Sequence, residues 1–448
     1  MLTSAEEMQA YGHDETEDLA FRPAVVVKPL LASEVAAIVS ECWKNNIPVT
    51  PRGAGTGLSG GALPVFGGVV LSLERMNRIV EVDTANGFVI TEPGVITEVL
   101  QDHLKELGWF YPPDPASRGS CFIGGNVAEN SGGPKAVKYG VVKDYVLNLE
   151  MVLPNGALIW TGANVMKNAT GYNLTQLVVG SEGTLGIVTR IVLRIIPHPT
   201  HTTLLLAPFR SAAQACEAVQ EIFKAGITPS GLEFMERDAI DWTLRFHPEI
   251  NLDASVLGDS VQAHLLIELD GMDPEILLKD AEKVARVLQS FEMEEVLFAE
   301  TAAEKDNLWR LRRSVAESVK AHSIYKEEDT VVPRGALPLL LKGVKEIGSR
   351  YGFRSVCYGH AGDGNLHVNI IKGALDEQRW KEELPKAIRE LFTLVVSLGG
   401  ALSGEHGIGY VQKPYMDIAF NATQLGLMRA IKKVFDPKGI MNPGKVIE

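Results

Sequence analysis

Two histidines flank a tight turn in the last quarter of the chain. Residues 358–370 read YGHAGDGNLHVNI, with His360 before the turn and His367 after it. If the flanking segments are strands, the two imidazoles lie across a hairpin from each other and can share one metal ion. Alternation along the second strand puts Asn369 on the face of His367. A hydrogen-bonded histidine pair on a polar hairpin is the alternative. A phosphate cradle is disfavoured, because neither a helix start nor a lysine follows the turn.

A second short segment, SGEHGIG, offers a carboxylate that completes such a metal site. Glu405 and His406 stand side by side in it, among glycines. Two imidazoles and one carboxylate with open coordination positions suit Zn²⁺, Mn²⁺ or Fe²⁺, and the open positions suit a chelating substrate. His360, His367 and Glu405 are therefore the candidate ligands, with the hydrogen-bonded histidine pair still the alternative. A nearby cation keeps His406 neutral and able to accept a proton, which makes it the candidate general base. A further metal ligand or a structural histidine is the alternative for His406.

Three glycine-rich segments in the first half of the chain indicate a large anionic ligand. PRGAGTGLSGGALP directly follows a strand pattern, and its glycines allow backbone N–H groups to turn inward on an anion. It is not a Walker A loop, since no Gly-Lys-Ser/Thr follows, and no helix or ribose-binding acid completes a dinucleotide fingerprint. CFIGGNVAENSGGPKAVKYG and NATGYNLTQLVVGSEGTLGIVT are the other two segments. Three independent tight corners are the alternative, but three such segments together favour a ligand with a pyrophosphate.

The overall composition is that of a globular protein with two or three domains. The chain has 448 residues, of which 46% are hydrophobic and 22% are charged. The net charge is −13, and no basic run is interleaved with aromatic residues, so nucleic-acid binding is not expected. An anion must instead be bound by a few locally placed cations.

Cysteine usage and hydropathy indicate a cytoplasmic location. The four cysteines are scattered and form no CxxC pair, which excludes a Cys-ligated iron–sulfur cluster on this chain and fits a reducing compartment. The first 21 residues lack the cationic start and apolar core of a signal peptide. No apolar run is long enough to span a bilayer. Any contact with a membrane is therefore expected to go through a partner.

The elements that must position these residues fall into two regions with different patterns. Residues 21–195 alternate short strand and helix patterns, including a helix over SEVAAIVSECWKNN capped by Ser33 and a hairpin around Asn86-Gly87. After about residue 200, longer helical patterns separate strands such as AHLLIELDG, which predicts an α+β domain with a mostly antiparallel sheet. Pro197 and Pro199 mark the junction.

Taken together, these motifs resemble the vanillyl-alcohol oxidase / p-cresol methylhydroxylase flavoprotein superfamily. Within it, the chain is similar to the D-2-hydroxy acid dehydrogenases, which include the glycolate oxidase D subunit, D-lactate dehydrogenase and D-2-hydroxyglutarate dehydrogenase. The three glycine-rich segments carry the resemblance, together with YPPDPAS, YGHAGDGNLHVNI, SGEHGIG and FDPKGIMNPGKV, and it covers nearly the whole chain.

The resemblance implies an α+β architecture with a PCMH-type FAD-binding domain and an FAD-linked oxidase C-terminal domain built on an antiparallel sheet. We expect an N-terminal segment (1–20), the FAD-binding domain (21–199), and a substrate domain with the metal hairpin (200–400). A last segment (401–448) is expected to complete the active site and dock on the FAD domain.

The resemblance also implies which residues contact FAD. The first glycine-rich loop wraps the pyrophosphate, and Glu182, Gly183 and Ile187 hold the adenosine side. The implied residues are Arg52, Gly53, Ala54, Gly55, Thr56, Gly57, Ser59, Gly60, Pro113, Asp114, Ser117, Gly124, Asn126, Ser131, Glu182, Gly183, Ile187 and Asn442. Relatives with covalent flavin often carry a histidine in the first loop. Here Thr56 lies in that stretch and no histidine does, so we expect non-covalent FAD.

For the substrate, the resemblance implies a carboxylate anchored by two cations. Arg312 matches the arginine that relatives use, and Lys326 matches a second cation; the alternative for Arg312 is a solvent-facing helix charge like Arg310 and Arg313. The 2-hydroxyglutarate enzymes carry a hydroxyl residue where this chain has Ala316, which favours a shorter acid of the lactate or glycolate class.

The implied reaction is oxidation of a small D-2-hydroxy acid to the 2-oxo acid, with hydride transfer to flavin N5 and a divalent metal, Zn or Mn, assisting. Arg312, Lys326, His406 and Asn369 are the expected catalytic residues. Electrons then pass to a quinone, an electron-transfer flavoprotein, an iron–sulfur subunit or oxygen. A homodimer and a hetero-complex both fit. The handedness of the acid is taken from the resemblance alone. Two other functions are the alternatives. One is a non-redox enzyme similar to alkyl-glycerone-phosphate synthase, but its relatives carry a histidine run where this chain has one histidine after Glu405. The other is a non-catalytic FAD-binding subunit, which should lack the metal and base positions.

Overall fold

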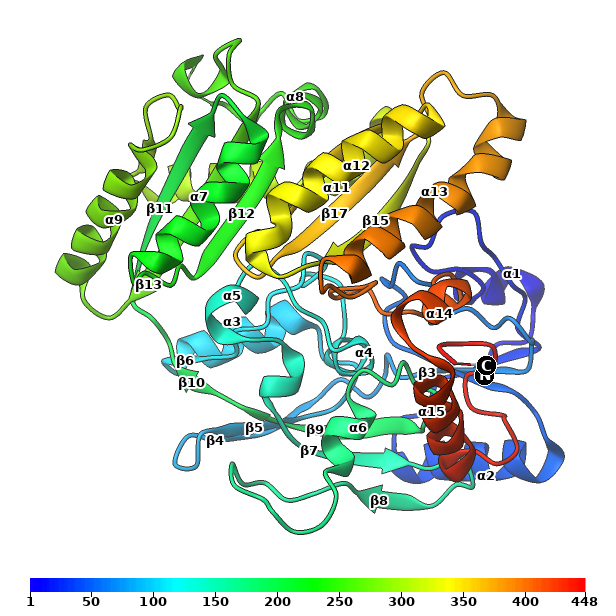
Figure 1. The fold of residues 1–448 in the computed structure, drawn as a ribbon. Coiled ribbons are helices and arrows are strands. Elements are labelled where there is room, and N and C mark those ends of the chain that lie inside the picture. Colours follow the sequence, from blue (N-terminus) through cyan, green and yellow to red (C-terminus); the bar gives the residue numbers. More distant parts are fainter. Residues whose placement is uncertain (253, 448) are drawn as a thin grey trace. The chain divides into compact units, whose positions relative to one another are not determined.

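The computed structural model describes residues 1–252 and 254–447 and divides the chain into two compact units (Figure 1). The first unit consists of residues 1–132, 141–198 and 405–448. The second consists of residues 133–140 and 199–404. Each unit therefore contains at least one segment that lies far along the sequence from the rest of it.

The first unit contains a small parallel sheet in the order β1-β3-β2. Its strands are β1 (Val25–Val27), β2 (Val49–Arg52) and β3 (Val69–Ser72). Helix α2 (Ala32–Asn45) packs its apolar face on this sheet. The expected cap was wrong: the helix begins after Leu31, and Glu34 accepts hydrogen bonds from the N–H groups of Leu30 and Leu31, so Ser33 lies inside the first turn.

A five-stranded antiparallel sheet forms the other half of the first unit, in the order β4-β5-β9-β7-β8. The predicted hairpin around residue 87 is confirmed by the pairing of β4 with β5, and Gly87 has a φ of +70°. The strands are β4 (Ile79–Asp83), β5 (Phe88–Thr91), β7 (Val146–Val152), β8 (Leu158–Trp160) and β9 (Ile187–Arg194), with a separate pair of β6 (Trp109–Phe110) and β10 (Ile196–Pro197). The helices are α1 (Ala5–Met8), α3 (Thr97–Glu106), α4 (Ile123–Glu129), α6 (Leu174–Val178), α14 (Met416–Ala419) and α15 (Ala422–Phe435).

The second unit is built on a seven-stranded sheet in the order β14-β11-β13-β12-β16-β17-β15. All its pairs are antiparallel, as predicted. The strands are β11 (His201–Phe209), β12 (Gly231–Glu236), β13 (Ala263–Gly271), β14 (Leu297–Ala299), β15 (Tyr325–Val331), β16 (Arg354–Gly359) and β17 (Asn365–Ile371). The helices are α5 (Ala136–Tyr139), α7 (Ala212–Lys224), α8 (Arg237–Phe246), α9 (Pro274–Leu288), α10 (Ala302–Arg313), α11 (Val315–His322), α12 (Leu337–Tyr351) and α13 (Glu377–Ser397).

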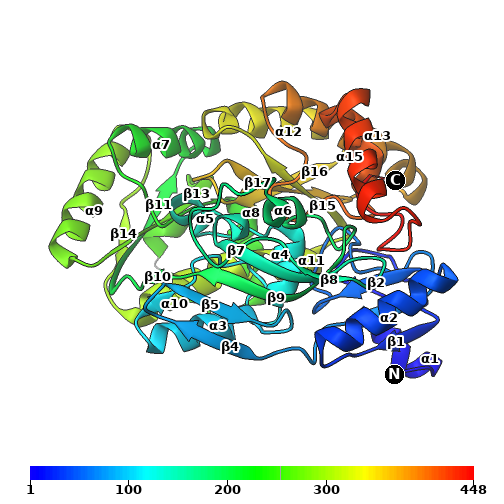
Figure 2. The same ribbon diagram turned by 90° about the horizontal axis from the view of Figure 1, so that it is seen from below.

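Helices cover both faces of this sheet. Figures 1 and 2 show α7, α9 and α12 on one face and α8, α10 and α11 on the other. The strand register puts Met235, Tyr358 and His367 side by side on the second of these faces. Met235 and Tyr358 belong to a hydrophobic core that also includes Trp309 of α10 and Val319 of α11. That core fixes α10 and α11 against the strands that carry the predicted site.

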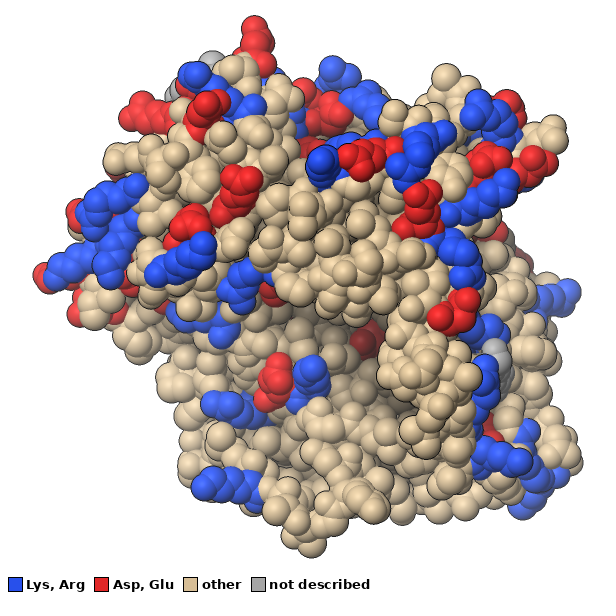
Figure 3. Space-filling view, in the orientation of Figure 1, with Lys and Arg blue, Asp and Glu red and all other residues tan. Residues whose placement is uncertain are grey.

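The surface of the second unit carries charges of both signs. Figure 3 shows basic and acidic side chains interspersed over α9, α12 and α13. Some form pairs one turn apart, such as Lys342 with Glu346 and Lys386 with Glu383. Exposed pairs of this kind contribute little to stability. Among the described residues, no helix is both long enough and apolar enough to cross a membrane.

Candidate functional site

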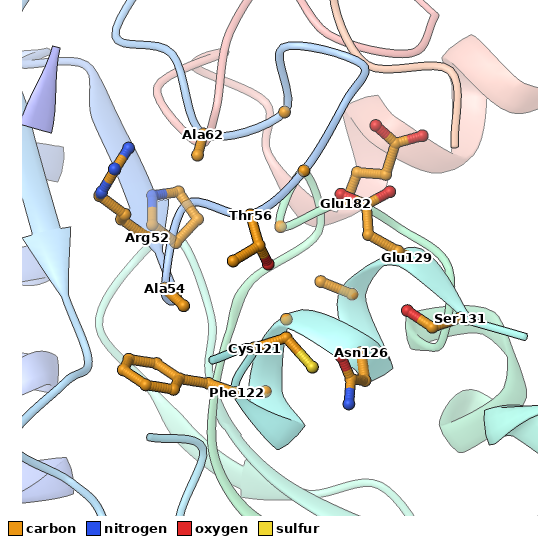
Figure 4. A pocket seen from close by; sticks show the side chains of 18 of the residues that line it. Arg52, Ala54, Thr56, Ala62, Cys121, Phe122, Asn126, Glu129, Ser131 and Glu182 are labelled. Carbon is orange, nitrogen blue, oxygen red and sulfur yellow. The ribbon is translucent and has the colours of Figure 1, made fainter. Parts of the chain in front are cut away.

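The three glycine-rich segments meet at one large cavity in the first unit (Figure 4). Its enclosed part has a volume of about 230 Å³, and the cavity is open to solvent beyond it. All three segments contribute residues to its wall.

Glycine is required in this wall for steric reasons. Gly55 has a φ of +78°, and a Cβ there would lie 2.1 Å from Nη2 of the Arg52 side chain. Gly183 has a φ of +67°, and a Cβ there would lie 2.5 Å from Cγ of Pro51. Both positions are backbone conformations that residues with side chains rarely adopt. The first and third segments thus present backbone rather than side chains to the cavity.

The second segment forms a short helix where the sequence suggested a loop. Gly124, Gly125 and Asn126 lie in α4 and line the cavity. The Asn126 side chain is buried and its Nδ2 donates a hydrogen bond of 2.6 Å to Oγ1 of Thr97. This contact fixes the helix to the start of α3.

Most of the predicted cofactor residues line this cavity, and some do not. Those in the lining are Arg52, Gly53, Ala54, Gly55, Thr56, Gly57, Ser117, Gly124, Asn126, Ser131, Glu182, Gly183 and Ile187. Those outside it are Ser59, Gly60, Pro113, Asp114 and Asn442. Asp114 instead pairs with Arg118, at 3.0 Å. Asn442 Nδ2 donates to the backbone oxygens of Gly61 and Glu182, so it joins the first and third segments from behind.

The segment with Glu405 and His406 also lines the cavity. Glu182 holds this segment in place: its Oε1 accepts from the N–H of Ile408 and its Oε2 from the N–H of Gly409, each at 2.7 Å. Two charge-assisted hydrogen bonds to adjacent amides restrict the backbone strongly. The role of Glu182 visible in the structure is therefore to position the turn that carries His406.

A second buried carboxylate, Glu129, lies beside Glu182, and Figure 4 shows both at the cavity wall. The sequence pattern does not single it out. Burial raises the pKa of Glu129 well above its ordinary value, and the neighbouring Glu182 and Asp14 raise it further. Burial also raises the pKa of Glu182 to about 7, against the opposing effect of the Ile408 and Gly409 amides. Two adjacent carboxyls cannot both ionise cheaply, so the pair favours a bound proton.

The carboxyl pair predicts a pH-dependent effect of Glu129→Gln on stability. Because the native pKa is raised, the native state binds more protons than the unfolded chain above about pH 4.5. Stability is therefore lost as pH rises from about 5 to 8, and the substitution should remove part of this loss. We expect the variant to gain stability relative to the wild type, by a margin that grows as pH rises over that range. Urea unfolding of the FAD-loaded proteins at both pH values measures it.

The control for this prediction is Glu106→Gln, at an exposed position at the end of α3. It makes the same chemical change without burial, so its effect on the free energy of unfolding should be the same at both pH values. A Glu129→Gln effect that is equally independent of pH would show that the pair does not hold a proton.

The predicted hairpin in the second unit is confirmed by the pairing of β16 with β17, in which Tyr358 lies opposite His367. His360 follows β16 directly, and its ring centroid is 5.5 Å from that of His367, with the rings edge to face. Gly364 closes the turn with a φ of +88°, where a Cβ would lie 1.9 Å from the Val332 oxygen. The turn thus brings the two imidazoles together, and both are buried.

Glu233 on β12 is the residue that holds this site together. Its carboxylate is fully buried and lies 2.8 and 2.9 Å from Nδ1 of His360 and 2.7 Å from Nη2 of Arg312. Burial alone would raise the pKa of Glu233, but the charges of His360 and Arg312 outweigh it and hold the pKa below its ordinary value. The sequence gives no sign of this contact, because Glu233 and His360 are 127 residues apart.

Arg312 is buried, unlike its exposed neighbour Arg310, which favours the predicted binding role over a solvent-facing charge. Its guanidinium carbon lies 5.1 Å from the Tyr358 ring centroid. The Nε and Nη2 atoms are buried and make no hydrogen bond of ordinary geometry within the described residues. Nη2 nevertheless lies 2.7 Å from the Glu233 carboxylate, so Nε is the buried donor that has no partner among the described residues.

The side chains of Asn369 and Lys326 lie on opposite faces of the sheet. Asn369 is fully buried two residues beyond His367 on β17, on the same face, as expected. Lys326 pairs with Ile370, so its side chain leaves the sheet on the opposite face from His367. The position that shares the face of His367 is Glu327, whose Oε1 lies 3.2 Å from Nδ1 of His367. The strand pairing therefore places Lys326 on the other face of the sheet from His367.

Comparison with known proteins places these features in a family. Residues 23–162 match the model of an FAD binding domain, and residues 198–446 match the model of FAD linked oxidases, C-terminal domain. The chain is 37% identical to a D-lactate dehydrogenase of Anaerostipes hadrus, over all of this chain and 94% of the relative. It is 37% identical to the glycolate oxidase subunit GlcD of Bacillus subtilis, over 97% and 91% of the two chains.

Solved structures show the same fold at lower identity. The structure of p-cresol methylhydroxylase with substrate bound superposes with a TM-score of 0.81 at 18% identity, covering 99% of this chain and 93% of that one. The fold agrees with the two family matches and with the full-length relatives. The chain belongs to the FAD-linked oxidases, and it is a flavin-dependent oxidoreductase with an FAD-binding domain and the C-terminal domain of that family.

Proposed function

We propose that this enzyme oxidises a small 2-hydroxy acid to the 2-oxo acid, with FAD in the cavity of the first unit and a divalent metal at His360, His367 and Glu405. The observation that carries the proposal is the buried Arg312, whose Nε has no hydrogen-bond partner among the described residues, over the sheet face that also holds the two imidazoles. Two similar proteins, a D-lactate dehydrogenase and a glycolate oxidase subunit, are named for enzymes that act on acids of this kind.

The cavity residues fit FAD. The glycines with positive φ give backbone N–H groups close access to a pyrophosphate, and all three glycine-rich segments line the cavity. Bound there, FAD supplies the acceptor for a hydride. Thr56 lines the cavity, and the first loop carries no histidine that could attach flavin covalently.

The absence of a histidine in the first loop predicts that acid precipitation releases the flavin. Purified protein treated with trichloroacetic acid should leave nearly all of its flavin absorbance in the supernatant. Flavin absorbance that stays with the washed pellet would show a covalent link through some other residue.

The donor set fits a divalent metal such as Zn²⁺ or Mn²⁺. His360 Nδ1 faces Glu233 and His367 Nδ1 faces Glu327, and we assign Nε2 of each ring to the ion. Asp329, opposite His367 in the strand pairing, accepts a hydrogen bond of 2.9 Å from the N–H of Gly404. Glu405 is the next residue in the chain. A metal held there would lower the pKa of a coordinated substrate hydroxyl.

The remaining steps belong to the side chains. Arg312 binds the substrate carboxylate through its Nε and Nη2 donors, and the buried amide of Asn369 orients the bound acid. His406 accepts the hydroxyl proton as the hydrogen leaves C2. Glu182 keeps His406 in place through the Ile408 and Gly409 amides. Ala316, next to Val315 at the start of α11, supports a short acid of the lactate or glycolate class.

The test is an anaerobic titration of the FAD-loaded, metal-supplied enzyme with D-lactate, L-lactate, glycolate and D-2-hydroxyglutarate. We expect one short 2-hydroxy acid to bleach the oxidised-flavin absorbance fully, with D-lactate strongly preferred over L-lactate. An absence of bleaching by all four acids, with FAD and metal present, would contradict the proposed reaction.

A further inference from the structure

Glu233 touches two groups that the proposed function assigns to different tasks. It lies on the central strand β12, is fully buried, and accepts from His360 Nδ1 through both carboxylate oxygens. The same carboxylate lies 2.7 Å from Nη2 of Arg312 on α10. One side chain thus joins the metal hairpin to the helix that presents the anion-binding arginine.

Toward His360, Glu233 selects one form of the ring. A carboxylate facing Nδ1 requires the proton on that nitrogen, so Nε2 is left as the atom with a lone pair. Carboxylate partners of this kind orient metal-binding imidazoles and make them better ligands. Without the carboxylate, the ring can turn or carry its proton on Nε2, and either change removes the ligand atom.

Toward Arg312, Glu233 supplies charge without using up the donors. Nη2 lies close to the carboxylate, but neither Nη2 nor Nε makes a hydrogen bond of ordinary geometry to any described residue. The contact is therefore an ion pair at one edge of the guanidinium. It keeps a buried cation compensated while its donors remain available to a second anion.

We propose that Glu233 is a positioning residue that makes metal binding and carboxylate binding depend on one buried charge. The inference rests on the proposed function, because it assigns His360 to the metal and Arg312 to the acid. It adds that the two subsites are not independent: loss of the Glu233 charge weakens both, although Glu233 touches neither ligand.

The test is Glu233→Gln, which keeps the size of the side chain and removes its charge. The amide is neutral, and its NH2 group takes the place of one of the two carboxylate oxygens that face Nδ1 of His360. Two constants are measured on the FAD-loaded protein: Mn²⁺ affinity without acid, by the electron paramagnetic resonance of free Mn²⁺, and pyruvate affinity after removal of metal with EDTA, by calorimetry. We expect each affinity to fall roughly 10- to 100-fold.

Glu236→Gln is the matched control. Glu236 ends the same strand, and its carboxylate accepts from the Cys357 N–H and from Lys345. The same chemical change there should leave both affinities unaltered. A Glu233→Gln protein that binds Mn²⁺ and pyruvate like the wild type overturns the inference, and so does one in which only one of the two constants changes.

Glu233→Asp covers the case in which the Gln variant does not fold. It keeps the charge but is one methylene shorter, so it cannot reach both partners, and unchanged constants in this variant also overturn the inference. A wild-type protein that binds neither Mn²⁺ nor pyruvate, and whose flavin no acid reduces, would instead overturn the proposed function itself.

Discussion

Replacement of His406 by Asn should leave FAD bound and slow reduction of the flavin by the acid about 100- to 10,000-fold, the usual contribution of a general base. The His406 side chain lines the cofactor cavity. Glu182 fixes the backbone of this segment by accepting hydrogen bonds from the amides of Ile408 and Gly409. Asn is similar in size and cannot accept the proton at neutral pH. The rate is measured by anaerobic stopped-flow mixing with saturating acid.

The control for this prediction is His103→Asn, on the exposed side of α3. It changes the same residue type away from the cavity and should leave the rate constant unaltered. If the base is His406, the residual rate of the His406→Asn variant should also lose its dependence on pH near neutrality. Rapid, pH-dependent reduction in that variant would assign the base to another residue.

Replacement of Arg312 by Lys should raise KM for the acid far more than it lowers kcat. Lysine keeps the positive charge but lacks the planar fork that can face Glu233 and a carboxylate at the same time. The loss of a charge-assisted hydrogen bond in a buried site costs about 2 to 3 kcal/mol, or roughly 30- to 150-fold in kcat/KM. Steady-state kinetics with an artificial electron acceptor measure both constants.

Arg310→Lys provides the comparison on the same helix. Arg310 is exposed two residues away, so the substitution should leave kcat/KM within about twofold of the wild-type value. If both substitutions lowered kcat/KM equally, the effect would come from the helix in general, and Arg312 would not be the residue that binds the substrate carboxylate.

The hairpin and both its histidines could be predicted from the sequence because the information is local. Alternation over residues 354–371 and the GDGN turn define two strands, and the histidines follow from their places in them. The glycine-rich segments were recognisable for the same reason, since a positive φ and a close backbone approach require glycine at particular positions.

What could not be predicted depends on contacts between distant strands. Glu233 is one acid among many in the sequence, and only the pairing of β12 with β16 puts it under His360. Lys326 was implied by the resemblance alone, and only the strand pairing shows that its side chain leaves the sheet on the other face from His367. Glu129 likewise has no distinctive sequence pattern, and only its burial beside Glu182 in the folded chain sets it apart.

The division of the first unit among separate stretches of chain has a consequence for biosynthesis. Its last stretch, residues 405–448, contributes Glu405 and His406 to the cavity wall, and the backbone of Ile440 and Asn442 hydrogen-bonds to Val49 at the start of β2. Lys445 Nζ donates a hydrogen bond to the Leu63 oxygen. A ribosome delivers these residues only after the entire second unit. The wall of the cofactor cavity therefore cannot be completed until the second unit has been synthesised.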